Sequence, residues 1–349
     1  MSVKITIDPR FIFNYASYYI YGLIEKFGEN NISFKPIQNL TVESYEDYRK
    51  GFAFTISSNG IIKNIFVDTN DSNKIHKRYY KWSDIYAKVN TTKEDSETKS
   101  KLIEIGPSFA IRVWNPLKTI YTGLRNYQKC GVGFRIPFKR YILDYLYTII
   151  RRLPYKYYHH ECREDLDYCF TLSTLWYDEG TYNSTNRLRG IFARKCKNTY
   201  PQFEGGFFYI NSPGVLKEFQ KYSEYLEEYK DMLIKKRISM KEYMARTVKS
   251  AIVFNTPSVL GCHGWKLGEY LAMGKAIIST PLNNIMPGSF VSGKHFISAS
   301  NDNEIEVTVD ELRKNPKKIL ELKKNATEYF NQYLSPTAVI ERILNRVTE

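Results

Sequence analysis

Strand-like and helix-like patterns alternate along both halves of the chain. In the first half, short apolar runs predict strands at 3–7, 52–56, 61–68 and 85–89. Apolar positions three and four residues apart predict helices at 15–27 and 74–82. The second half predicts strands at 168–176 and 249–254, and helices at 187–196, 215–230 and 240–247. This alternation favours an α/β fold with parallel sheets.

Three further stretches differ from that alternation. Residues 93–100 are charged and polar and predict a surface loop. Residues 325–347 predict a last helical stretch interrupted at Ser335-Pro336. Residues 138–152 combine basic ends with aromatic and aliphatic residues, which fits either a helix buried between domains or one resting on a membrane surface.

In the segment 262–282, the residue type at almost every position can be explained by the local structure that it predicts. Gly261 and Gly264 allow a tight turn, and a helix is expected from Trp265 to Met273 with Gly274 as its left-handed stop. The apolar run 276–279 predicts a strand covered on both faces. The order is therefore loop, short helix and buried strand.

Lys266 and Glu269 lie three residues apart in this helix and share a face with Tyr270. A helix N-terminus behind a glycine turn, with a lysine in its first turn, favours phosphate binding. A glutamate one turn further can accept hydrogen bonds from sugar hydroxyls. The combination predicts a nucleotide-sugar site, and the alternative is an ordinary strand-helix unit with a solvated helix face.

This segment resembles the C-terminal signature of GT-B glycosyltransferases of the group 1/family 4 type. The resemblance implies that Lys266 and the helix N-terminus at Gly264 face the donor diphosphate and that Glu269 binds the nucleotide ribose. His263 lies beside this helix, where it could contact the phosphate or the transferred sugar, or serve as a structural hydrogen-bonding residue. Gly261 stands where many retaining members have a second glutamate, so the stereochemical course stays open.

The resemblance also implies the domain organisation. We expect an acceptor-binding Rossmann-like domain at 1–160 and a donor-binding one at 161–325, facing each other across a cleft. Residues 326–349 should form a helix that packs back on the first domain.

Two more groups of residues are candidates for donor binding. Arg189 falls in the first turn of the helix expected after the first strand of the second domain, where an arginine can hold a diphosphate with paired hydrogen bonds. The resemblance pairs Arg189 with Lys266 across the diphosphate, and a solvated basic helix face is the alternative. Gly205 and Gly206 predict a loop that contacts the nucleoside, or a plain tight turn.

The catalytic base is expected in the first domain. Transfer to a hydroxyl needs a carboxylate or a histidine that accepts its proton. Asp68 ends an apolar strand and is the first candidate, Asp8 follows the first strand, and His76 lies just beyond Asp68. Residues 68–71 could instead supply a turn and a helix cap.

Composition limits the partners of the chain. A net charge of +14 predicts anionic partners such as a nucleotide diphosphate, nucleic acid or an acidic membrane surface. Five scattered cysteines and a first strand in place of a signal peptide favour a cytoplasmic protein with reduced thiols, soluble or peripheral at the inner face of the membrane. Asp165-Leu166-Asp167 follows a polar connector, so we expect neither a catalytic metal nor a cofactor besides the donor.

The expected function is transfer of a hexosyl or deoxyhexosyl group from a GDP- or UDP-linked sugar. The acceptor would be a hydroxyl of a glycan or lipid-linked oligosaccharide, in polysaccharide, capsule or O-antigen biosynthesis. A basic nucleic-acid-binding protein is one alternative, although the basic residues are spread along the chain and no recognised binding module occurs. A non-catalytic sugar- or nucleotide-binding relative is the other.

Overall fold

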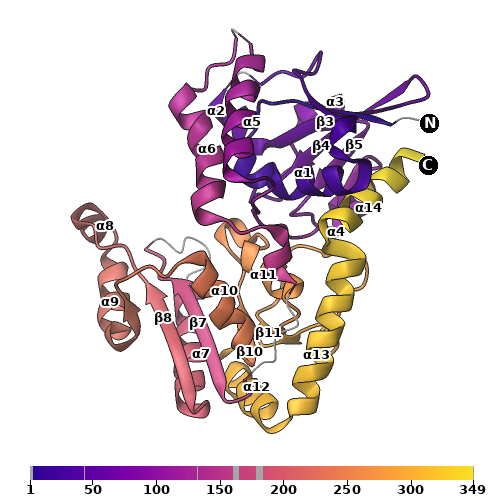
Figure 1. Cartoon of the computed structure of the whole chain (residues 1–349). Coiled ribbons are helices and arrows are strands. Elements are labelled where there is room, and N and C mark those ends of the chain that lie inside the picture. The colour runs from indigo at the N-terminus through magenta and orange to yellow at the C-terminus, as the bar shows by residue number, and fades with distance from the viewer. Residues whose placement is uncertain (1–2, 43, 132, 160–164, 178–183, 349) are drawn as a thin grey trace. The chain divides into compact units, whose positions relative to one another are not determined.

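The computed structural model describes residues 3–42, 44–131, 133–159, 165–177 and 184–348 (Figure 1). The chain forms two compact units. Unit 1 comprises residues 1–157, 284–289 and 330–349, and unit 2 comprises residues 158–283 and 290–329. The domain boundary expected at 160/161 lies outside the described residues.

Unit 1 is built on a six-stranded mixed sheet. Its strands are β1 (Lys4–Ile7), β2 (Ile32–Phe34), β3 (Gly51–Ser58), β4 (Ile61–Asp68), β5 (Ile85–Lys88) and β6 (Leu102–Glu104). The strand order is β2-β1-β3-β4-β5-β6. β3 runs antiparallel to both β1 and β4, and the other pairs are parallel. The expected α/β class is confirmed, whereas a wholly parallel sheet in this half is wrong.

The antiparallel strand follows from the turn between β3 and β4. Asn59 and Gly60 form this turn with φ of 53° and 79°. Two consecutive left-handed residues match the twist of a two-residue hairpin, and Asn-Gly is the pair that adopts them most readily. The chain therefore reverses at once, and β3 pairs with β4 along its full length.

Seven α-helices accompany this sheet among the described residues. They are α1 (Phe13–Phe27), α2 (Tyr45–Lys50), α3 (Lys77–Trp82), α4 (Lys93–Thr98), α5 (Pro116–Lys129), α6 (Phe138–Arg151) and α14 (Pro336–Thr348). The surface loop expected at 93–100 is wrong because Thr92 caps α4, its hydroxyl accepting a hydrogen bond from the Asp95 amide.

The C-terminal helix α14 packs on α1. The Tyr18 hydroxyl donates to the Leu334 carbonyl at 2.6 Å, and Lys26 pairs with Glu341 at 2.6 Å. Gly22 lets the two helices approach closely, because a Cβ there would lie 2.3 Å from the Pro336 carbonyl oxygen. A π-helical turn, Phe330–Leu334, separates α14 from α13 (Pro316–Tyr329), which confirms the predicted interruption.

The described residues of unit 2 form six parallel strands. They are β7 (Tyr168–Thr174), β8 (Gln202–Phe208), β9 (Leu233–Ile234), β10 (Ile252–Asn255), β11 (Ala276–Ser279) and β12 (Ile297–Ser298). Two three-stranded groups, β7-β8-β9 and β10-β11-β12, lie beside each other: the Ala251 amide donates to the Tyr168 carbonyl, and the Phe170 amide donates to the Ser250 hydroxyl, both at 2.9 Å. The resulting order, β9-β8-β7-β10-β11-β12, is that of a doubly wound nucleotide-binding sheet.

Helices of unit 2 connect these strands. They are α7 (Thr185–Thr199), α8 (Pro213–Glu218), α9 (Gln220–Glu228), α10 (Met240–Lys249), α11 (Trp265–Ala272), α12 (Asp302–Lys314) and α13. Phe192 of α7 stacks on Phe254 of β10 with ring centroids 4.8 Å apart, at the centre of the core. The single helix expected at 215–230 is wrong, because Phe219 leaves the helical backbone and packs its ring on Tyr177.

Candidate functional site

The candidate donor site lies where the strand order of unit 2 reverses. Chain order runs outward from β7 in one direction and from β10 in the other. Loops after two such strands diverge at their carboxyl ends and leave a crevice in which doubly wound sheets bind ligands. Thr174 ends β7 and Thr256 follows β10. Figure 1 shows β7 and β10 close together in unit 2.

Arg189 of α7 lies at the carboxyl ends of these two strands. Its Nε donates to the Thr256 hydroxyl at 3.0 Å, and its Nη1 donates to the Thr174 carbonyl at 3.3 Å. The guanidinium also lies over the Trp176 ring, 5.0 Å from its centroid. These contacts hold a half-buried cation between the ends of the two central strands.

Lys266, in the first turn of α11, lies at the same strand end. Its Nζ donates to the Leu172 carbonyl and, at 3.2 Å, to the Ser173 hydroxyl, both in β7. Burial, followed by the nearby charge of Arg189, lowers the pKa of Lys266 to about 7, and Glu269 partly opposes this shift. The structure thus holds two cations near each other, an arrangement that a bound anion would stabilise.

Glu269 is buried one turn further along α11 and is 5% exposed. Its charge contributes to the raised pKa values of Tyr243 and Tyr270, which burial chiefly causes. His263 is also buried, just before α11. All the residues expected in the donor-diphosphate group, Arg189, His263, Gly264 and Lys266, are therefore in unit 2, with Arg189 and Lys266 brought together.

The two glycines before α11 differ in what their backbone requires. Gly261 has φ of 70°, a conformation that side-chain-bearing residues rarely adopt. Gly264 is the N-cap of α11 with φ of −72°, which any residue can adopt, and no side chain caps the helix. The Leu267 amide in the first turn of α11 donates to the Gly264 carbonyl at 3.1 Å.

Gly205 and Gly206 occupy a strand, so the expected loop is wrong. Both lie within β8, with φ of 119° and 141°. A Cβ on Gly205 would lie 1.8 Å from the Thr171 carbonyl oxygen of β7, and one on Gly206 would lie 2.0 Å from the Met232 carbonyl oxygen. Close strand pairing accounts for both glycines.

The two carboxylates expected as bases are engaged within unit 1. Asp68 is fully buried, and its Oδ2 accepts from Lys88 Nζ at 2.7 Å and from the Tyr86 hydroxyl at 2.5 Å. Asp8 is 1% exposed and accepts hydrogen bonds from the Arg10 side chain and from the Ile37 amide. Both geometries favour structural anchoring over proton transfer.

His76 differs from these carboxylates because its side chain is only half-buried. It precedes α3, and its backbone amide donates to the Tyr86 hydroxyl at 3.1 Å. Burial, and then the charge of Lys50, lowers the pKa of the imidazole. A neutral imidazole near pH 7 can accept a proton.

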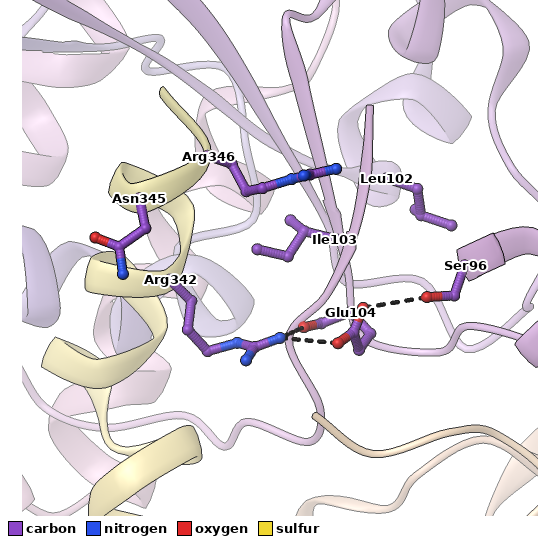
Figure 2. A pocket seen from close by; sticks show the side chains of 7 residues that line it. All are labelled: Ser96, Leu102, Ile103, Glu104, Arg342, Asn345 and Arg346. Atoms are coloured by element: carbon purple, nitrogen blue, oxygen red, sulfur yellow. Dashed lines mark hydrogen bonds and ion pairs between the residues drawn. The ribbon is translucent and has the colours of Figure 1, made fainter. Parts of the chain in front are cut away.

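A separate pocket of about 330 Å³ lies in unit 1 between β6 and α14 (Figure 2). Arg342 donates to the Glu104 carboxylate at 2.8 Å, and the Ser96 hydroxyl donates to it at 3.3 Å. Arg346, the second arginine of the lining, donates to the Ser100 carbonyl at 3.0 Å, so the lining keeps a net positive charge. It contains none of the residues that the sequence predicts for donor binding or catalysis.

The Asp165-Leu166-Asp167 motif is engaged in ion pairs. Asp165 pairs with Lys249 at 3.2 Å, and Asp167 pairs with Arg313 at 2.6 Å. Within the described part of the chain, no group of three or more histidine, cysteine, aspartate or glutamate side chains could hold a metal.

Sequence reasoning missed Thr174, Trp176 and Thr256, which position Arg189. The signal was present for Thr256, a polar residue two positions after the apolar run 251–254. It was weaker for Trp176, because the sequence alone does not indicate which cation its ring will contact.

Comparisons with known proteins give structural matches only. No family model and no curated protein matches the sequence. The chain is similar to Anabaena HepE in complex with UDP, with 9% identity and a TM-score of 0.45 over 78% of this chain and 65% of that one. It is also similar to a glycosyltransferase from Rickettsia africae (11% identity, TM-score 0.45, 96% of this chain and 80% of that one). The chain thus spans slightly less than two thirds of the length of HepE.

Proposed function

We propose that this chain is a GT-B glycosyltransferase that uses a nucleotide-diphosphate sugar. The transferred group would be a hexose or deoxyhexose, and the acceptor a hydroxyl of a glycan or lipid-linked oligosaccharide in surface polysaccharide assembly at the inner face of the membrane. The observation that carries the proposal is the pair Arg189 and Lys266, held at the carboxyl end of β7 in a doubly wound sheet. Lys266 and Glu269 stand at the positions that the glycosyltransferase signature assigns to donor binding.

In this proposal, the two cations act on the diphosphate. Arg189 and Lys266 neutralise it in the bound donor, and they stabilise the nucleoside diphosphate leaving group as its negative charge develops. Glu269 accepts hydrogen bonds from the ribose, and no metal is required for these steps.

We assign proton removal from the acceptor to His76 rather than to Asp68 or Asp8. The resemblance places this step in the first domain, and His76 combines partial exposure with a lowered pKa. The carboxylates of Asp68 and Asp8 would first have to break charged hydrogen bonds. His76 is therefore the base that requires the least rearrangement of unit 1.

A panel of nucleoside diphosphates tests the donor site. GDP, UDP, CDP and ADP should differ in how far they raise the melting temperature, since only a specific pocket distinguishes the bases. Lys266→Ala and Arg189→Ala should each weaken binding of the preferred nucleotide by about 1.5–3 kcal/mol. Lys195→Ala is the matched control, because this lysine lies on α7 but pairs with Asp310. Unchanged affinity in both site variants would refute the donor site.

A non-catalytic binding relative is the second candidate, and Gly261 favours it. Its left-handed backbone disfavours the glutamate that many retaining members carry there. Nucleotide binding without release of nucleoside diphosphate from any nucleotide sugar, with acceptors present, would support this candidate over the enzyme.

A further inference from the structure

Helix α5 buries its small and polar residues and exposes its aliphatic ones. Thr119 and Asn126 are each 1% exposed. Gly123 lies against the Tyr145 ring, and Asn126 Nδ2 donates to the Tyr145 hydroxyl at 3.2 Å. The exposed large hydrophobic residues are Leu117, Ile120, Tyr121 and Leu124. Their spacing of three and four residues places them on one face, opposite to the pattern of a helix that packs its apolar side inward.

Helix α6 likewise buries polar side chains and exposes aliphatic ones. Its buried positions are Tyr141, Asp144, Tyr145 and Thr148. Its outer positions include Leu143, Tyr147 and Ile150, the last 77% exposed. The expectation that this helix is buried holds only for its aromatic and polar side.

The two helices are neighbours in unit 1. Figure 1 shows α5 and α6 side by side, and Tyr127 of α5 contacts Phe138 and Tyr141 of α6 with ring centroids 5.1 and 5.3 Å apart. We call the exposed residues Leu117, Ile120, Tyr121, Leu124, Leu143, Tyr147 and Ile150 the α5–α6 face. Two outward-facing tyrosines add side chains that suit the boundary between lipid and water.

The segment that carries this face is strongly basic, and Glu29 from another part of unit 1 pairs with Lys118 at 2.5 Å. Between residues 116 and 152 the basic residues are Lys118, Arg125, Lys129, Arg135, Lys139, Arg140, Arg151 and Arg152. The single acidic residue in the same span, Asp144, is buried and pairs with Arg140 at 2.7 Å. Arg151 lies over the Tyr147 ring at 5.4 Å, so a cation borders the aliphatic positions.

We propose that the α5–α6 face docks on an anionic lipid surface. Aliphatic and aromatic side chains would enter the headgroup boundary while the surrounding cations contact acidic headgroups. A second copy of the chain fits this face less well, because symmetric pairing would bring its basic residues against the same basic residues. This surface does not depend on the donor site or on glycosyl transfer.

Vesicle co-sedimentation tests the proposal on the full chain. The protein should bind phosphatidylcholine vesicles that contain about one third phosphatidylglycerol, and binding should weaken at high salt. It should bind pure phosphatidylcholine far less. Leu117→Ser with Ile150→Ser should lower the partition coefficient by about tenfold or more, since both side chains lose apolar contact. Arg125→Gln with Lys139→Gln should lower it by a similar factor, at about fivefold per charge.

Matched controls come from elsewhere in the chain. Ile61→Ser with Ile62→Ser removes two exposed isoleucines at the start of β4, and Lys317→Gln with Lys324→Gln removes two exposed lysines of α13. Both controls should bind anionic vesicles within about twofold of the parent, apart from a general charge effect. Absence of vesicle binding, equal binding to neutral vesicles, or equal losses in the controls would overturn the proposal. A dimer in solution that Leu117→Ser with Ile150→Ser dissociates would assign the face to a second copy instead.

Discussion

At the scale of single residues, Lys266 should make nucleotide binding depend on pH. Its pKa of about 7 means that the free protein loses this ammonium charge as the pH rises from 7 to 9. A bound diphosphate favours the charged form, so affinity should fall by up to about tenfold per pH unit in that range. Calorimetric titration at several pH values measures this slope.

The control variants separate Lys266 from other titrating groups. Lys266→Ala should bind more weakly and lose most of the slope, and Lys266→Arg should retain a charge with a flat profile. The same slope in Lys266→Ala would assign the effect elsewhere. Folding stability should change in the opposite direction: because the lysine binds its proton more tightly when unfolded, its contribution to stability rises between pH 7 and about 10.5.

Among single residues, the sequence identifies those whose role is local. Lys266 and Glu269 belong to one short helix, so their spacing already places them on one face. Asp68 could not be interpreted in the same way. Its partners Tyr86 and Lys88 lie on the next strand, and the sequence does not show that their side chains converge on it.

At the scale of elements, the Asn59-Gly60 turn should carry a measurable part of the stability of unit 1. Gly60 has φ of 79° and nothing within 4 Å of a Cβ position, so Gly60→Ala introduces conformational strain without a clash. We expect a loss of about 1–2 kcal/mol in the free energy of unfolding. Gly133→Ala, at a site without positive φ or close neighbours, should change it by less than about 0.5 kcal/mol. Urea denaturation distinguishes the two, and equal effects would contradict this account.

The sequence predicted elements correctly where the spacing of apolar residues and the residues that end an element indicated the same structure. The segment from Trp265 to Ser279 forms the predicted helix, glycine stop and strand, with Gly274 at φ of 57°. The prediction was wrong where a local capping or turn motif was not used. It was also wrong where a residue of an adjacent strand determines the conformation. Thr92 with Asp95 signals the cap of α4, and Asn59-Gly60 signals the hairpin. Gly205 resembles a loop residue, yet the carbonyl of Thr171 on the adjacent strand is what requires it.

At the scale of the whole molecule, the strand order brings residues from separate sequence motifs together in one candidate site. The sequence places Arg189 and Lys266 far apart, on helices that follow different strands. They converge because β7 and β10 are neighbours, and this adjacency depends on long-range pairing such as that between Ala251 and Tyr168. Within the described residues no helix is long and apolar enough to cross a membrane.

The division into two units predicts that loss of turnover and loss of donor binding can be separated. His76→Ala changes unit 1, whereas Arg189 and Lys266 belong to unit 2. We expect His76→Ala to retain nucleotide affinity and to lower turnover by about 10²–10⁴-fold, the contribution of a positioned base. In the parent protein, turnover should fall as the pH drops through the lowered pKa of His76, below 6.5, because the protonated imidazole accepts no proton.

Asp68→Asn is the companion variant, because we expect it to lower folding stability rather than to remove a catalytic base. It leaves the Lys88 ammonium buried without its carboxylate, which should cost about 3–5 kcal/mol of folding free energy. Glu341→Gln removes an exposed pair with Lys26 in the same unit and should cost less than about 1 kcal/mol. A stable Asp68→Asn protein with lost turnover and intact nucleotide binding would return the base to Asp68. Normal turnover in His76→Ala would exclude His76 and leave Asp8 to be tested in the same way.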